Sequence, residues 1–198
     1  MNYLSNKEGQ LRAFTFFKEE HAKKPIFSVG AEIKPMQSEL YVNKEITVGG
    51  GKVSLLIGST DNETGVTNFD GNKLDEGRAF AIDGIAFHIG LGDTKEKPFN
   101  VDFTQTLTGV QKMAFQFANL VIRQKNELIF SLPISSILNG NEGIENLYRD
   151  LDLILIKPKE KVEVEIEFPD GVTPPTLEAG KSMFVSVVLR GYETYQRR

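Results

Sequence analysis

Three glutamates, Glu163, Glu165 and Glu167, alternate with apolar residues in the segment KEKVEVEIEFPDG at residues 159–171. Alternate side chains of a strand share a face and lie roughly 6–7 Å apart, a spacing that superficially suits the paired carboxylates of a glycosidase. Such a pair needs a cleft that separates the two pKa values, and the chain has no Trp to line one. Three lysines at alternate positions precede the glutamates. The pattern therefore favours a solvated strand face that protects a sheet edge.

The other residues capable of catalysis or metal binding are few and scattered. The chain has no cysteine, which excludes disulfides, thiolate metal sites and a cysteine nucleophile. Its two histidines, His21 and His88, lie on different segments, whereas a metal site of the cupin kind needs two or three histidines with a carboxylate. His88 lies between two apolar residues in IAFHIG, so we expect it to point away from the core.

The sequence contains no pattern typical of a catalytic serine. A serine nucleophile needs a histidine beside it that an acid orients. The pair Ser135-Ser136 has no histidine nearby in sequence, and no G-x-S-x-G motif is present. We therefore predict a protein that is not an enzyme, and we assign no catalytic, cofactor-binding or metal-binding residue and no cofactor.

Two loops contain residues that could form ligand sites. The segment VGGGKVSLL at residues 48–56 lacks the spacing of a phosphate-binding loop and leads into a strand pattern, so we expect a turn there. The loop at residues 59–77 carries oxygen ligands of the kind that Ca²⁺ prefers, but their spacing does not match a calcium loop. We expect a solvated surface loop, with calcium binding as an open alternative. Its acidic residues are Asp61, Glu63, Asp70, Asp75 and Glu76.

Composition predicts one globular domain. Of 198 residues, 40% are hydrophobic and 25% are charged, which is enough apolar material for a core. The net charge of -4 disfavours a dedicated nucleic-acid binder with a cationic surface. The first residues lack the basic and apolar segments of a secretory signal, and no apolar run approaches the ~18 residues that span a bilayer. We therefore expect neither a signal peptide nor a transmembrane segment.

Short alternating segments separated by turn residues predict roughly nine to eleven strands. The alternation in RAFAIDGIAFHIG changes phase at Asp83-Gly84, which predicts a β-bulge. Residues 113–133 also fit a helical period, but we favour a hairpin that turns at QKNE. Residues 26–33 and 99–107 are expected to be strands, and residues 134–150 are the one place where we expect a short helix.

These elements predict an all-β fold, an antiparallel β-sandwich in the form of a single jelly roll with one short helical insertion. In the sandwich we expect Val162, Val164, Ile166 and Phe168 to face the core. We expect three parts along the chain: residues 1–25 as an N-terminal arm and first strand, 26–192 as the sandwich, and 193–198 as a C-terminal tail.

The order of segments near the C-terminus resembles a known family. ILIKPKEKVEVEIEFPDG, VTPPTLEAG and SMFVSVVLRGYE are similar to the closing strands of jelly-roll virion proteins from tailless icosahedral viruses and phages. GRAFAIDGIAFHIG resembles an early long strand of such a roll, and FANLVIRQKNELIFSLPISSIL resembles its hairpin leading to a short helix. The resemblance covers residues 77–192. It implies a non-enzymatic structural subunit of a capsid or virion, too short for two full rolls, that assembles through loops and termini.

The resemblance also implies partners and a location. A homo-oligomer, contacts with other virion proteins and a place in a virion assembled in the host cytoplasm follow from it, while shell, vertex and decoration stay open. The mildly basic N-terminal residues and the tail RGYETYQRR are candidates for weak contact with genome phosphates. The alternative is a carbohydrate-binding or cell-surface-binding β-sandwich module, which the absence of Trp weakens.

Overall fold

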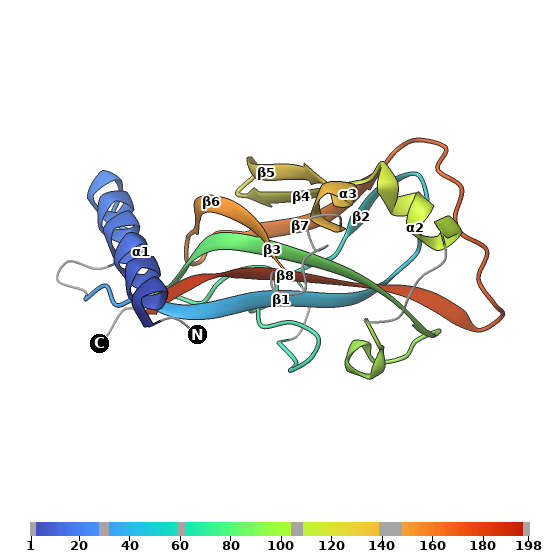
Figure 1. Ribbon diagram of the computed structural model, residues 1–198, viewed down its shortest axis with the longest axis horizontal. Helices are drawn as coiled ribbons and strands as arrows, with labels where there is room; N and C mark the ends of the chain where they lie inside the picture. The colour runs from blue at the N-terminus through green and yellow to red at the C-terminus, as the bar shows by residue number, and fades with distance from the viewer. Residues whose placement is uncertain (1–2, 28–31, 59–61, 104–108, 139–147, 196–198) are drawn as a thin grey trace.

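Two antiparallel sheets of four strands each pack face to face in the computed structural model, which describes residues 3–27, 32–58, 62–103, 109–138 and 148–195 (Figure 1). Sheet A has the strand order β1-β8-β3-β6, and sheet B has the order β2-β7-β4-β5. The strands are β1 (Met36–Ile46), β2 (Gly51–Ser54), β3 (Arg78–Asp93), β4 (Asn119–Gln124), β5 (Glu127–Pro133), β6 (Arg149–Ile156), β7 (Val162–Phe168) and β8 (Lys181–Tyr195).

The antiparallel sandwich and several of its details confirm the sequence-based predictions. Of the three glycines at residues 49–51, the first two lie between β1 and β2, and Gly51 is the first residue of β2. The hairpin of β4 and β5 turns at Lys125 and Asn126, whose φ angles of 53° and 66° fit the type I′ turn that matches the twist of a hairpin. A short helix, α3 (Ile134–Leu138), lies in the segment where one was expected; residues 139–147 of that segment lie outside the described residues.

The predicted bulge is also present in β3. The register of β3 shifts between Ile82 and Gly84 in its pairing with both β6 and β8. Ile82 and Ile85 both lie in the core on either side of the shift, because Asp83 is the one extra residue. The interruption of the alternation therefore restores the apolar side chains to the inner face.

The prediction for the N-terminal segment is wrong. Residues 1–25 were expected to be an arm and a first strand, but residues 3–23 form α1 (Tyr3–Lys23), which lies across one end of sheet A (Figure 1). Ala13 and Phe17 are one helical turn apart and fully buried, so a narrow apolar stripe on the helix faces the sheet. The apolar cluster LRAFTFF therefore packs as a helix rather than as a strand.

Four other segments differ from the predictions. Residues 109–116 form α2 (Gly109–Gln116), so the hairpin begins only at Asn119. Pro98–Asn100 form the 3₁₀-helix η1, and residues 101–103 belong to no strand, while 104–108 lie outside the described part of the chain. Residues 26–27 and 32–33 are not in a strand either, and 28–31 are not described. Strand β8 continues to Tyr195, so the expected tail at 193–198 begins inside a strand.

The main core lies between the two sheets. The four apolar residues predicted to face inward on β7 are buried, and they meet the inner residues of β8, Met183, Val185, Val187 and Leu189, in one cluster. A second cluster lies outside sheet A, under α1. It contains Ala13, Phe17, Phe27, Ala79, Ala81 and Tyr192. The molecule thus has one core inside the sandwich and a smaller one that holds the helix.

Candidate functional site

The acidic face of β7 is neutralised by basic residues on the neighbouring strands. Arg123 of β4 donates from Nη1 to Glu165 Oε2 at 2.8 Å and from Nη2 to Glu167 Oε1 at 3.0 Å. Lys52 of β2 lies 2.9 Å from Glu167, and a lysine at position 161 pairs with Glu163. We call these residues the charged ladder, because they cross three strands of sheet B.

The charged ladder lacks the electrostatics of a general acid and base. Hydrogen bonds from Lys52 and Arg123 hold the pKa of Glu167 below its ordinary value, so this carboxyl stays ionised near neutral pH. A glycosidase needs one carboxyl with a raised pKa as its proton donor. The sequence identified the three glutamates, but their partners depend on the pairing of β7 with β4 and β2, which the sequence does not reveal.

A second polar cluster lies on the outer face of sheet A, at the bulge. Arg190 of β8 donates from Nε to Asp83 Oδ1 and from Nη2 to Asp150 Oδ1, both at 2.8 Å. Burial alone would lower the pKa of Arg190, but the hydrogen bonds to Asp83 and Asp150 raise it. The Arg190 guanidinium also lies 5.1 Å from the ring of Tyr148. The bulge turns Asp83 outward. Its pairing with Arg190 could not be predicted from the sequence, because it depends on the register of β3 with β8.

A cavity of about 430 Å³ separates this cluster from α1. Burial raises the pKa of Tyr192 in its wall, and the charge of Asp83 adds to the shift. Burial and a hydrogen bond to Glu39 raise the pKa of the neighbouring Tyr148 to about 12. Both phenols therefore stay protonated at neutral pH, and neither serves as a base. The cavity is lined by Glu8, Gly9, Arg12, Asp83, Asp150, Leu151, Arg190 and Tyr192.

A buried ion pair joins Arg78 to Glu193 at the end of sheet A. The Arg78 Nη1 donates to the carbonyl of Asn68 at 2.9 Å, and the hydroxyl of Ser38 donates to Glu193 Oε2 at 2.9 Å. Each charge is thus paired and further hydrogen-bonded, as buried charges require. The pair links the start of β3 to β8, with further contacts to β1 and to the loop at Asn68. Both charges are engaged with these partners.

The two histidines lie on separate elements. His88 lies on β3 between Phe87 and Ile89, which are both in the main core, so its side chain is on the outer face as expected. Burial lowers the pKa of His88. His21 lies near the end of α1, where its Nδ1 accepts the N–H groups of Ile26 at 3.1 Å and Phe27 at 3.5 Å. Within the described ranges, no three histidine, aspartate or glutamate side chains form a group that could hold a metal ion.

The acidic loop and the serine pair have structural partners. Glu63 pairs with Lys97 at 3.0 Å and Glu76 with Lys159 at 2.6 Å, while Asp61 lies outside the described residues. The Ser136 hydroxyl donates to the carbonyl of Pro133 at 2.7 Å. Calcium binding by the loop stays the open alternative to a solvated surface loop.

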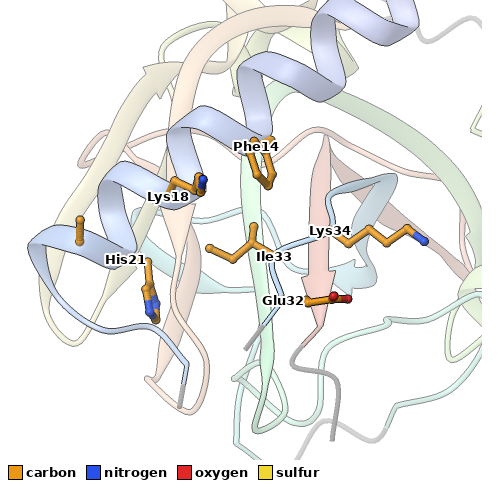
Figure 2. Close-up of a pocket in the computed structure, with 7 residues that line it drawn as sticks. Phe14, Lys18, His21, Glu32, Ile33 and Lys34 are labelled. Atoms are coloured by element: carbon orange, nitrogen blue, oxygen red, sulfur yellow. The ribbon is translucent and has the colours of Figure 1, made fainter. Parts of the chain in front are cut away.

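A groove with an apolar floor runs between α1 and the segment that leads into β1 (Figure 2). Its volume is about 560 Å³. One wall is the helix face with Phe14, Lys18, His21 and Ala22, and the other is the segment of Glu32, Ile33 and Lys34. We call it the helix groove. The helix groove could not be predicted from the sequence, because it depends on α1, and residues 1–25 were not expected to form a helix.

No protein-family model, curated protein or solved structure matches the chain. None of the helices in the parts of the chain that the structure describes has the length and apolar character needed to cross a membrane.

Proposed function

We propose that the chain is a single jelly roll that acts as a non-enzymatic structural subunit, of the kind that builds viral capsids. The observation that carries the proposal is the pairing order of the strands. β1 pairs with β8, β2 with β7, β3 with β6 and β4 with β5, all antiparallel. This is one long hairpin that closes at the turn between β4 and β5. Wrapping the hairpin around itself adds the contacts of β3 with β8 and β4 with β7.

A wrapped hairpin of eight strands in two sheets is the architecture of jelly rolls, which viral capsid and lectin domains share. The family resemblance of residues 77–192 supports the capsid use within this class. It covers the long strand β3, the hairpin of β4 and β5, α3 and the closing strands β7 and β8. The fold alone does not choose between capsid and lectin functions.

Exposed apolar side chains outside the sheets' inner faces favour self-assembly. Large hydrophobic side chains on or next to the short helices and at the end of a hairpin are more than half exposed. Protein interfaces are enriched in Phe and Met. Neighbouring subunits would cover them. They are Phe99 at 52%, Met113 at 62%, Phe117 at 70% and Leu128 at 59% exposure.

Assembly is tested by the size of the purified protein. Analytical ultracentrifugation and electron microscopy over a range of concentration and salt should show oligomers, rings or shells well above the 22.1 kDa chain. Phe117→Asp should weaken assembly without unfolding the chain, because this ring is exposed. Glu163→Gln in the charged ladder is the matched control on another surface.

A protein that stays a monomer in every condition would contradict the proposal. If such a monomer binds a glycan array, the carbohydrate-binding alternative takes its place. Contacts with other virion proteins and a location in the virion belong to the same proposal. Weak genome contact would come from exposed basic residues of α1, such as Lys7 and Arg12, rather than from an extended arm.

A further inference from the structure

We propose that the helix groove binds a single-chain anionic amphiphile, of which a fatty acid is the simplest example. Its carboxylate would lie near Lys18 and His21, and its alkyl chain would lie against Phe14 and Ile33 (Figure 2). This site is separate from the polar surfaces described above, and the inference does not depend on assembly.

Both walls of the groove are held in place. On the helix, Phe14, Lys18 and Ala22 are spaced by four residues and so share one face. The end of this helix is tied to the next segment through the Nδ1 of His21, which accepts the N–H groups of Ile26 and Phe27. In the other wall, the N–H of Lys34 donates to Thr194 Oγ1 of β8 at 3.1 Å. Ile33 packs against the second core.

The hydrogen-bonding groups on the helix wall are donors. Because His21 Nδ1 accepts backbone hydrogen bonds, the neutral ring carries its proton on Nε2 and donates from there. The Lys18 Nζ lies 4.9 Å from the centre of the Phe14 ring, and no carboxylate among the described residues forms an ion pair with it. An ammonium and an imidazole N–H beside an apolar floor complement a negatively charged head group on an apolar chain.

The opposite wall contributes no net charge. Glu32 and Lys34 carry opposite charges, and Figure 2 shows both extending from the side of the segment opposite to Ile33. Lys18 therefore sets the sign of the charge that the groove selects. The groove volume of about 560 Å³ lies within the range of about 300–1,000 Å³ that is typical of small-molecule sites.

The test uses ligands that share a chain length and differ in head-group charge. Isothermal titration of the full chain with decanoate, below its micelle concentration, should show saturable binding, while decyltrimethylammonium should bind at least about tenfold more weakly. Lengthening the chain from octanoate to decanoate should raise the affinity by about fourfold per methylene that is buried. Amide shifts in NMR spectra should change at Phe14, Lys18 and Ile33.

Lys18→Glu should weaken decanoate binding by about tenfold or more and favour the cationic ligand. Lys7→Glu is the matched control, because it makes the same charge change at another exposed position of α1 that does not line the groove. Both side chains are exposed, so thermal melts should show both variants folded.

The proposal fails if anionic and cationic ligands bind equally, if decanoate does not bind at millimolar concentration, or if Lys7→Glu weakens binding as much as Lys18→Glu. It also fails if the NMR shifts gather at the exposed ring of Phe117 instead of the groove. These results concern ligand binding and not the assembly state. The proposal of ligand binding and the proposal of self-assembly can therefore fail separately.

Discussion

The outer faces of the two sheets differ in what covers them. In β7 of sheet B, buried and half-buried residues alternate strictly, and the half-buried ones are the glutamates of the charged ladder. In β3 and β8 of sheet A, buried residues run almost without interruption. The reason is that α1 covers one end of the outer face of sheet A, while Val101 and Phe184 meet against Gly92 toward the other end.

This difference shows that the alternation of apolar and polar residues in a strand indicates whether one or both faces of its sheet are covered. A strict alternation marks a sheet with one face toward water, and a continuous apolar run marks a sheet that is covered on both faces. Phe184 and Ala86 belong to the outer face of sheet A and yet are no more than 1% exposed. The same sandwich therefore contains one sheet whose outer face is open to solvent and one sheet whose outer face is largely covered by its own chain.

The largest expected effect comes from a charge on the inner face of β7. Ile166 is fully buried in the main core, so Ile166→Asp would place an unpaired carboxylate among apolar side chains. We expect it to lower the free energy of unfolding by at least about 4 kcal/mol, measured by urea denaturation. Glu163→Gln on the opposite face of the same strand is the control and should change the stability by less than about 1 kcal/mol. A folded Ile166→Asp variant of unchanged stability would contradict the assignment of the inner face.

A second variant tests whether the outer face of sheet A is covered. Phe184 is 0% exposed although it points away from the main core, so Phe184→Ala should lower the free energy of unfolding by about 3–5 kcal/mol. Glu165→Ala on the outer face of sheet B should cost less, about 1–2 kcal/mol, because it removes one charged hydrogen bond while Arg123 keeps its bond to Glu167. Equal small effects of the two substitutions would mean that the outer faces do not differ.

The sequence was enough to predict what depends on local alternation. The inner face of β7, the bulge at Asp83 and the hairpin of β4 and β5 each follow from a pattern within a few residues, and the structure confirms all three. The direction of His88 followed from its two apolar neighbours in the same way.

What the sequence did not predict depends on contacts between distant segments. Arg123 reaches two glutamates of β7, and Arg190 reaches Asp83 and Asp150, only because of the pairing registers in the two sheets. The helix at residues 3–23 was missed because its apolar residues fit a strand as well as a helix. The sequence of β8 contains a signal for such a covering element. Its second apolar face, which includes Phe184, requires some other part of the chain to cover it.

A third, smaller effect concerns how closely α1 approaches sheet A. A Cβ added at Gly9 would overlap the hydroxyl oxygen of Tyr192, so Gly9→Ala should lower the free energy of unfolding by about 1–2 kcal/mol. This sign is opposite to that expected from helix propensity, which favours Ala over Gly by about 1 kcal/mol.

The double variant Gly9→Ala with Tyr192→Phe separates the two effects. Without the hydroxyl, the nearest ring atom is Cζ at 3.3 Å from the added Cβ, so most of the lost stability should return. Circular dichroism during urea denaturation gives the double-mutant cycle, with an expected coupling of about 1 kcal/mol. If Gly9→Ala alone is as stable as the natural chain, α1 does not rest on Tyr192.

The smallest expected effect is the contribution of the charged ladder to the pH dependence of the free energy of unfolding. Hydrogen bonds from Lys52 and then Arg123 lower the pKa of Glu167 in the folded chain. A carboxyl whose folded pKa is depressed stabilises the fold above its unfolded pKa, and this contribution is lost as the pH falls through the folded pKa. Because the pair is partly exposed, it contributes at most about 1 kcal/mol, and less in 1 M salt.

Urea denaturation at pH 7 and pH 3 should therefore show a smaller pH dependence for Glu167→Gln than for the natural chain. Glu127→Gln, at the exposed start of β5, is the control. If Glu127→Gln reduces the pH dependence of stability as much as Glu167→Gln does, the ion pairs of the charged ladder do not stabilise the fold. The glutamates on the outer face of sheet B would then act only as solvated charges.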